Sequence, residues 1–408
     1  MPPYRALVRT LVEARRLINS SDEPASMDEI LVQLGFTGPA RALDPLACDR
    51  LGLPRGVARA RVARGDGALR ALVVEISVDG ESRHVLTTIA RQLSTRVPHL
   101  LWLIVAVQIG SPLFTVMVWR TCSPHPQLLA LTSDRGAVVD SDAETLCALA
   151  ACTGGPSGDV MRHLRWTDVL GREAVTRRFY RALENSVGEL TASLGPHVPT
   201  SAAREVALLT TSRLLFLSFV ETKGWLNADF GFLANGFADC VAAGGGYHRR
   251  VLEPLFFGTL NTRTSARAAR ARAFGRVPFL NGGLFARSAL ERQWRRHSFS
   301  DEALGAFFGD LLVRYRFTSR EGASGWSDAA IDPEILGKAF ALLMSADERK
   351  KGGVFYTPQA LVERLTVLTL VPALTCAEVS AETVERALEG RPLEVLDLDD
   401  RSRAALLD

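Results

Sequence analysis

Residues 351–358 read Lys-Gly-Gly-Val-Phe-Tyr-Thr-Pro, and this pattern predicts a helix that begins at the final Thr-Pro pair. The hydroxyl of Thr357 can accept a hydrogen bond from a free N–H of the first turn, and Pro358 suits the first helical position because it lacks an N–H. Apolar residues then recur at helical spacing from Leu361 to Leu368. Two glycines before a capped helix leave bare N–H groups near the positive end of its dipole, which favours a small anion. An ordinary loop-to-helix junction remains the alternative on spacing alone.

Two earlier segments accompany this one. Residues 213–226 read Arg-Leu-Leu-Phe-Leu-Ser-Phe-Val-Glu-Thr-Lys-Gly-Trp-Leu, and residues 277–285 read Val-Pro-Phe-Leu-Asn-Gly-Gly-Leu-Phe. Together with residues 332–358, they resemble in order the connector and the start of the methyltransferase domain in N6-adenine DNA methyltransferases. The similar proteins are the type IIG restriction–modification enzymes and the BREX phage-resistance methyltransferases. The resemblance covers residues 213–358, and the first 200 residues match much less clearly.

This resemblance implies a cofactor and a reaction. In such enzymes the Phe-Tyr-Thr-Pro element lines the S-adenosylmethionine pocket. Tyr356 and Pro358 would pack near the cofactor, and the hydroxyl and amide of Thr357 would receive its carboxylate, in agreement with the physics of a capped helix start. The complete enzyme would methylate adenine N6 in DNA, as part of restriction–modification or phage defence. Asn281-Gly-Gly283 is interpreted as a turn in the connector, with no catalytic role.

Two parts of a complete methyltransferase are absent from the sequence. One is a glycine-rich loop after a strand, and the other is an Asn/Asp-Pro-Pro-Tyr/Phe element that binds the flipped adenine. Residues 393–397 resemble a strand, but Leu-Asp-Asp follows them. We therefore expect the N-terminal portion of a larger methyltransferase, whether a truncated gene, a split subunit or a partial record, which is inactive alone. The alternative is a non-catalytic DNA-binding or scaffold subunit that partners a separate methyltransferase chain.

The region 56–152 shows an α/β pattern that raises the possibility of a nuclease. Strands are predicted at 69–78, 100–107 and 113–119, with a helix at 83–96. Nucleases of the PD-(D/E)xK type place an Asp before a strand that carries Glu-x-Lys, and the carboxylates bind Mg²⁺. Here Asp66 precedes the strand that carries Glu75, but Ser77 replaces the lysine. The prediction is a degenerate, inactive nuclease-like domain. Such a domain would need Mg²⁺ only if it were active. An unrelated α/β domain is the alternative.

Four regions are predicted along the chain. A helical segment spans 1–55, the nuclease-like α/β domain spans 56–152, a mainly helical connector spans 159–345, and the start of a Rossmann-like methyltransferase domain spans 346–408. Residues 152–158 form the linker between the second and third regions because they are rich in glycine. In the chain's helical part, helices are predicted at 167–194, 201–223, 302–317 and 333–344.

An arginine cluster is the candidate DNA contact. Such clusters can follow a phosphate backbone, although a solvated arginine-rich surface is the alternative. The candidate residues are Arg263, Arg267, Arg270, Arg272 and Arg276. The net charge of +3 for the whole chain is too small to indicate nucleic-acid binding by itself.

Composition favours a cytoplasmic protein. The chain is 47% hydrophobic and 23% charged, as is usual for globular domains. Its six cysteines show no metal-ligand spacing, so we expect reduced thiols and no metal site. Residues 100–119 carry no charge and approach a membrane-spanning length, but Gly110-Ser111-Pro112 interrupts them. Two buried strands joined by a turn explain this stretch better than a membrane helix.

Overall fold

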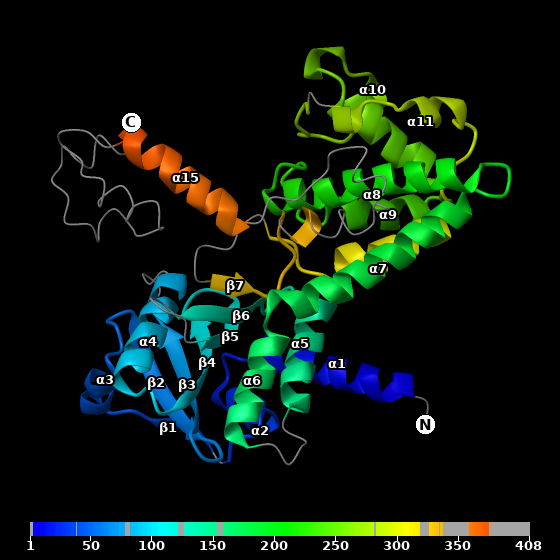
Figure 1. The fold of residues 1–408 in the computed structure, drawn as a ribbon. Coiled ribbons are helices and arrows are strands. Elements are labelled where there is room, and N and C mark those ends of the chain that lie inside the picture. Colours follow the sequence, from blue (N-terminus) through cyan, green and yellow to red (C-terminus); the bar gives the residue numbers. More distant parts are fainter. Residues whose placement is uncertain are drawn as a thin grey trace. The chain divides into compact units, whose positions relative to one another are not determined.

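The computed structural model comprises two compact units (Figure 1). The first contains residues 1–320 and 327–332, and the second contains residues 321–326 and 333–408. The residues that the structure describes are 3–37, 39–77, 82–120, 126–152, 158–280, 283–318, 326–333, 335–337 and 359–374.

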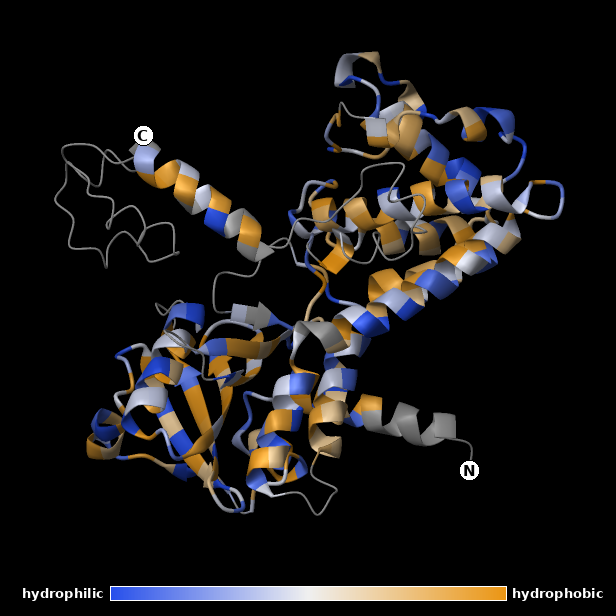
Figure 2. Cartoon of the chain, viewed as in Figure 1, coloured by the Kyte–Doolittle hydropathy of each residue, from blue (hydrophilic) through white to orange (hydrophobic). Residues whose placement is uncertain are grey.

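A mixed sheet organises the N-terminal part of the first unit. Its strands lie side by side in sequence order: β1 (Arg41–Ala42), β2 (Val57–Arg64), β3 (Leu69–Ile76), β4 (Leu101–Gln108), β5 (Leu113–Arg120), β6 (Gln127–Asp134) and β7 (Trp326–Asp328). β3 and β4 are parallel and are connected by α4 (Ser82–Arg96), whereas the other pairs from β1 to β6 are antiparallel. The middle strands are apolar along most of their length (Figure 2), as expected for strands buried on both faces.

The sequence predicted the centre of this sheet. The predicted strands 69–78, 100–107 and 113–119 and the helix 83–96 are confirmed, with ends shifted by one or two residues. The uncharged stretch 100–119 forms two antiparallel strands, and Gly110 has the positive φ of 74° that their turn requires. No helix among the described residues is long and apolar enough to cross a membrane. The mixed α/β character of the fold is therefore confirmed.

Helices pack around the sheet and continue into the chain's helical part. Those nearest the sheet are α1 (Pro3–Asn19), α2 (Pro24–Gln33), α3 (Pro45–Leu51), α5 (Asp140–Ala151) and α6 (Asp159–Val169). α6 contacts β3, β4 and β5, and α1 packs against α5. An ion pair between Arg15 and Asp140 reinforces the contact between α1 and α5. The N-terminal helical segment therefore belongs to the same packed body as the sheet.

The helical part is less regular than the sequence indicated. It contains α7 (Arg172–Ser193), α8 (Thr200–Thr222), α9 (Phe232–Ala242), the π-helical turns η1 (His248–Leu252), η2 (Pro254–Leu260) and η5 (Phe308–Val313), the 3₁₀ turns η3 (Thr264–Ala266) and η4 (Gly283–Phe285), and the short helices α10 (Ala269–Arg272), α11 (Ala289–Gln293) and α12 (Asp301–Phe307). The helix predicted at 201–223 is confirmed as α8.

Two helix predictions need correction. The single helix predicted at 167–194 is two helices, because Gly171 takes an extended conformation with ψ of 141° between α6 and α7. The helix predicted at 302–317 is α12 followed by the wider π-helical turn η5, which ends at Val313. Beyond it, the backbone N–H of Ser141 donates to the carbonyl of Arg314 at 2.9 Å, so residues after η5 return to α5.

The second unit contains the helix that follows the Thr-Pro pair. α15 (Gln359–Leu374) confirms the helical rhythm, and Leu361, Leu365 and Leu368 are exposed on it. Residues 351–358 lie outside the described residues, as do the linker residues 153–157 and most of the helix predicted at 333–344.

The turn between β2 and β3 gives a stability prediction. Gly67 has a φ of +56°, and a Cβ there would lie 2.4 Å from Oδ2 of Asp159, which accepts a hydrogen bond from Ala68. We expect Gly67→Ala to lower the free energy of unfolding by about 1–3 kcal/mol through left-handed strain. The matched control is Gly188→Ala in α7, where a Cβ meets nothing within 4 Å. This control should raise the free energy by about 0.5–1 kcal/mol, because alanine favours a helix interior. Urea denaturation measures both free energies of unfolding. Equal changes for the two variants would contradict the strain expected at position 67.

Candidate functional site

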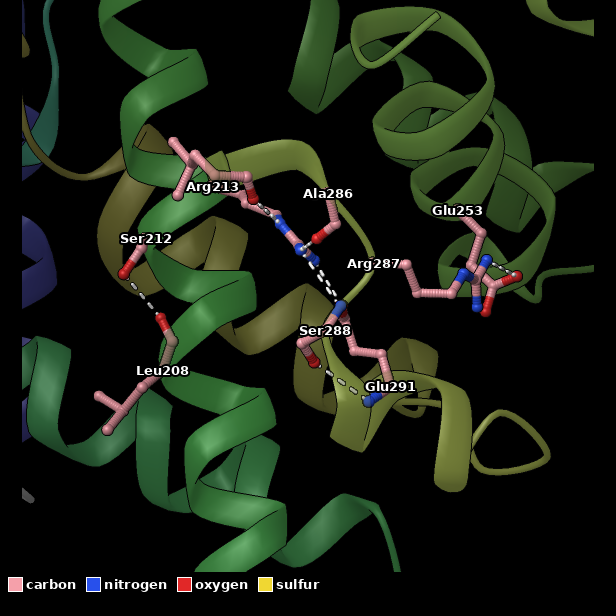
Figure 3. Close-up of polar contacts among 9 residues, drawn as sticks. Leu208, Ser212, Arg213, Glu253, Ala286, Arg287, Ser288 and Glu291 are labelled. Carbon is pink, nitrogen blue, oxygen red and sulfur yellow. Dashed lines mark hydrogen bonds and ion pairs between the residues drawn. The ribbon is translucent and has the colours of Figure 1, made fainter. Parts of the chain in front are cut away.

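A buried arginine lies at the centre of the helical part. Arg213 extends from the middle of α8 and is 0% exposed. Its Nε donates to the carbonyl of Leu284 at 2.7 Å, and its Nη2 donates to the carbonyl of Ala286 at 2.9 Å (Figure 3). Both nitrogens Nη1 and Nη2 also donate to the carboxylate of Glu291. The guanidinium therefore fastens the loop 284–291 to α8.

Glu291 completes this joint from the other side. It forms a capping box with Ser288, in which each side chain bonds the other residue's backbone N–H at the start of α11. Burial alone would raise the pKa of Glu291, but the bonds from Arg213 and Ser288 outweigh it and hold the pKa below its usual value. The ionised carboxylate therefore stabilises the fold above its unfolded-state pKa, and this stability is lost as pH falls through the lower folded-state pKa.

The joint brings together two of the three segments that carry the family resemblance. Arg213 opens the segment 213–226, and Leu284 lies in the segment 277–285, so the two meet at one guanidinium. The rings of Phe256 and Phe257 lie about the same guanidinium, with centroids 5.3 and 5.2 Å from its carbon. The Arg213 side chain is fully buried and donates four hydrogen bonds within the protein, so it is not accessible to a substrate. These contacts between the two segments therefore stabilise the fold.

A small pocket adjoins this joint. It encloses about 20 Å³ and is lined by His248, Glu253, Arg287 and Trp294, among others. This volume suits a single water molecule and not a cofactor. Burial lowers the pKa of His248 to about 4, so its imidazole is neutral near pH 7. Arg287 lies 4.0 Å from the centroid of the Phe257 ring and pairs with Glu253 at 3.5 Å, which closes the pocket's side.

The surface around this pocket is strongly basic. Residues 246–300 contain eleven arginines and two glutamates and no other charged residue apart from histidine, a formal charge of +9 in a chain whose total is +3. The rest of the chain therefore carries a net charge of −6. Both glutamates, Glu253 and Glu291, are already paired with arginines. The arginines exposed on this surface are Arg249, Arg250, Arg263, Arg270, Arg272, Arg276, Arg292, Arg295 and Arg296.

One of the predicted DNA contacts is wrong. Arg267 is only 4% exposed, and its guanidinium donates to the backbone carbonyls of Thr262, Val277 and Pro278 at 2.9–3.1 Å. It stabilises the irregular segment between η2 and η4, much as Arg213 stabilises the loop 284–291. A side chain used in this way cannot also bind a phosphate.

The other four members of the predicted cluster remain candidates. Arg263, Arg270, Arg272 and Arg276 are all exposed. Arg270 donates to the carbonyl of Arg250 at 2.8 Å, which holds its guanidinium beside the chain without neutralising its charge. Their charges are therefore open to solvent.

The predicted nuclease pair does not assemble. Asp66 lies in the turn before β3, where its 71% exposed carboxylate faces Arg162 at 3.5 Å. Glu75 lies near the opposite end of β3, about 20 Å away along the strand from Leu69. The residue opposite Glu75 in β2 is Arg59, whose guanidinium lies 3.6 Å from its carboxylate. The two carboxylates therefore cannot share a metal ion.

The remaining site predictions concern a metal and the cofactor. Among the described residues, no group of three or more His, Cys, Asp or Glu side chains could bind a metal ion. Cys48, Cys147, Cys152 and Cys240 form no disulfide bond. The cofactor candidates Tyr356, Thr357 and Pro358 lie outside the described residues.

Comparison with known proteins gives one relative. Over 185 residues, 43% of this chain, it is 28% identical to a protein of Methanocaldococcus jannaschii named "Putative type II restriction enzyme and methyltransferase RM.MjaORFECS2P". The match spans 15% of that protein's length. The chain is thus similar to part of a protein with a restriction–modification name. No family profile matches the chain. No solved structure matches it either.

The buried ion pair gives the second stability prediction. Arg213→Met would leave the buried Glu291 and two carbonyls without a donor, so we expect the free energy of unfolding to fall by about 3–5 kcal/mol. The free energy of unfolding of Arg213→Lys should lie between those of Arg213→Met and the native chain. A lysine keeps the charge but cannot bond three acceptors in one plane. The control is Arg16→Met, which removes exposed pairs with Glu13 and Glu29 and should leave the unfolding midpoint nearly unchanged. Urea unfolding of all three variants checks the order, and similar losses for Arg213 and Arg16 would contradict it.

Proposed function

We propose that this chain is the DNA-contacting, N-terminal part of an adenine-specific DNA methyltransferase in a restriction–modification or phage-defence system. The complete enzyme would transfer a methyl group from S-adenosylmethionine to adenine N6. The similarity to a protein named as a restriction enzyme and methyltransferase supports a role in such a system. The ordered segments of the connector, which resemble those of adenine methyltransferases, support the reaction.

The observation that carries the DNA contact is the concentration of positive charge in one part of the first unit. Residues 246–300 concentrate a charge of +9, and the rest of the chain is acidic overall. Arginine suits phosphate because its planar guanidinium bonds two oxygens at once. Phosphate contacts position a protein on DNA without reading its sequence. This surface would therefore hold the duplex, whereas the recognition of a base sequence would come from elsewhere.

The N-terminal sheet would act as a nuclease-like domain without nuclease chemistry. Its order of strand β3, helix α4 and parallel strand β4 is the order that the nuclease resemblance implies. Ser77 stands in place of the lysine, and Arg59 faces Glu75 across the hairpin. A cation opposite the carboxylate neutralises the charge that would attract Mg²⁺. The domain would then be a scaffold.

Tyr356, Thr357 and Pro358 are proposed to line one side of the S-adenosylmethionine pocket. A carboxylate is a suitable ligand for a threonine-capped helix start, since the hydroxyl and the free N–H groups can both donate to it. The cofactor would supply the methyl group, and these residues would bind and orient its amino-acid end.

The DNA contact can be tested by the salt dependence of binding. Replacing Arg263, Arg272 and Arg276 by Gln should lower the affinity for duplex DNA and reduce the slope of log K against log salt by about 2–3, roughly one unit per lost phosphate contact. The matched control replaces Arg41, Arg55 and Arg91 by Gln; these three are exposed too but belong to the N-terminal part. Fluorescence anisotropy over a series of salt concentrations gives both slopes. Equal slopes for the two triple variants would contradict the assigned surface.

Methyl transfer by the chain alone is the second test. We expect no N6-methyladenine when the chain is incubated with labelled S-adenosylmethionine and adenine-containing duplex DNA, because no glycine-rich loop follows residues 393–397 and no Asn-Pro-Pro-Tyr element is present. A characterised adenine methyltransferase provides the positive control. Label in the DNA would show that the chain is a complete enzyme and would overturn the proposed division of roles.

A further inference from the structure

The loop that follows α8 exposes two large aromatic rings. Residues 224–231 read Gly-Trp-Leu-Asn-Ala-Asp-Phe-Gly, and within them Trp225 is 61% exposed and Phe230 is 73% exposed. The Phe230 ring lies 3.4 Å from where a Cβ on Gly224 would be, so it covers the residue that precedes Trp225. Exposed apolar side chains that gather in one place can form a contact with a partner. Leu226 between them is fully buried and anchors the loop.

The backbone of this loop adopts an unusual conformation. Asn227 and Ala228 have φ of 57° and 56°, the left-handed region that residues with a Cβ seldom enter. Two consecutive residues in this region persist only where the surrounding structure fixes them, and such strain is frequent at binding sites. The conformation turns the chain between Trp225 and Phe230 and so presents both rings from one short loop.

The contacts that fix the loop come from the basic surface. The N–H of Asn227 donates to the carbonyl of Arg276 at 2.9 Å, and the N–H of Arg276 donates to Oδ1 of Asn227 at 3.0 Å. Gly275 permits this approach, because a Cβ there would lie 2.3 Å from the same Oδ1. Phe232 and Phe274 pack with centroids 6.4 Å apart and strengthen the joint. The aromatic loop is therefore fastened to a segment that carries exposed arginines.

Two cations and one carboxylate lie close in sequence to the two rings or are bonded to their loop. Lys223 is exposed two residues before Trp225, and the exposed Arg276 is bonded through its backbone to Asn227. The one carboxylate within the loop, Asp229, is engaged in accepting from the N–H of Gly231 at 2.9 Å and from Asn235 at 3.3 Å. Aromatic faces next to cations are the combination that binds nucleobases by stacking and the adjoining phosphates by charge.

We propose that Trp225 and Phe230 form a stacking site for an unstacked nucleobase of the DNA bound on the arginine surface. This inference rests on the proposed function, since it needs DNA as the partner. A chemistry that modifies a base must first take the base out of the duplex. The rings would stabilise this unstacked base, or the neighbouring base that is exposed when it leaves the duplex. Arg276 and Lys223 would contact the adjoining phosphates.

The experiment compares variants that separate aromatic from merely apolar character. The double variant Trp225→Leu with Phe230→Leu keeps apolar bulk but removes both π faces, and the double variant Trp225→Phe with Phe230→Tyr keeps two rings. The probes are a labelled oligothymidylate, a labelled intact duplex, and the same duplex with one adenine opposite an abasic site. We expect the leucine variant to bind the oligothymidylate and the abasic duplex roughly 5- to 150-fold more weakly, the usual effect of losing one stacked base. The ring-preserving variant should bind like the native chain, and the intact duplex should change little.

The results distinguish a failure of the stacking site from a failure of the proposed DNA-binding function. A loss on both the single strand and the abasic duplex supports a site for any unstacked base, and a loss on the abasic duplex alone supports one for a base extruded from a duplex. Equal affinity of the leucine and native chains for all probes, with DNA still bound, overturns the stacking site and leaves the arginine surface intact. A change in oligomeric state without a change in DNA affinity also overturns it, because the rings would then contact protein. No binding of the native chain to any probe overturns the proposed function itself.

Discussion

The helical part of this protein depends on the buried guanidinium of Arg213. A charge taken out of water is costly unless hydrogen bonds within the protein replace those to water, and here Leu284, Ala286 and Glu291 accept four hydrogen bonds from the guanidinium. This requirement dictates the course of the chain from η4 to α11, which contains little regular structure of its own. The planar fork of arginine bonds carbonyls and a carboxylate together, which a lysine could not do. The same side chain therefore selects one conformation of a loop that has few other constraints.

Arg267 repeats this device a short distance away. Its three bonds to backbone carbonyls hold the segment between η2 and η4, where π-helical and 3₁₀ turns leave carbonyls without helical partners. The arginines of residues 246–300 thus differ in their surroundings. The buried Arg267 replaces missing backbone hydrogen bonds, and the half-buried Arg287 pairs with Glu253, whereas the other nine are exposed to solvent. Only the exposed arginines can give the surface its affinity for an anion.

Sequence reasoning succeeded where a single physical pattern decides the structure. The buried strands at 100–119 follow from an uncharged run broken by a turn, and α8 follows from its long apolar run. It failed where tertiary contacts decide. The break at Gly171 and the π-helical turn η5 depend on packing that no local spacing records. The position of Arg267 in a basic run indicated a surface role. This prediction was wrong because the sequence carries no signal that one arginine of such a run is buried. The pairing of Glu75 with Arg59 required the register of the β2–β3 hairpin, whereas the length of β3 separates Glu75 from Asp66.

Helix α8 joins the parts of the proposed DNA-binding surface. Its middle carries Arg213, which fixes the loop 284–291, and its end leads into the aromatic loop, which Asn227 fastens to Arg276. One rigid helix therefore sets the spacing between the arginine surface and the exposed rings. Rigid spacing would matter for the proposed stacking site, because the energy of unstacking a base can be recovered only if the stacking partner is already in place. A surface of mobile arginines could hold DNA, but it could not by itself favour the distorted duplex over the regular one.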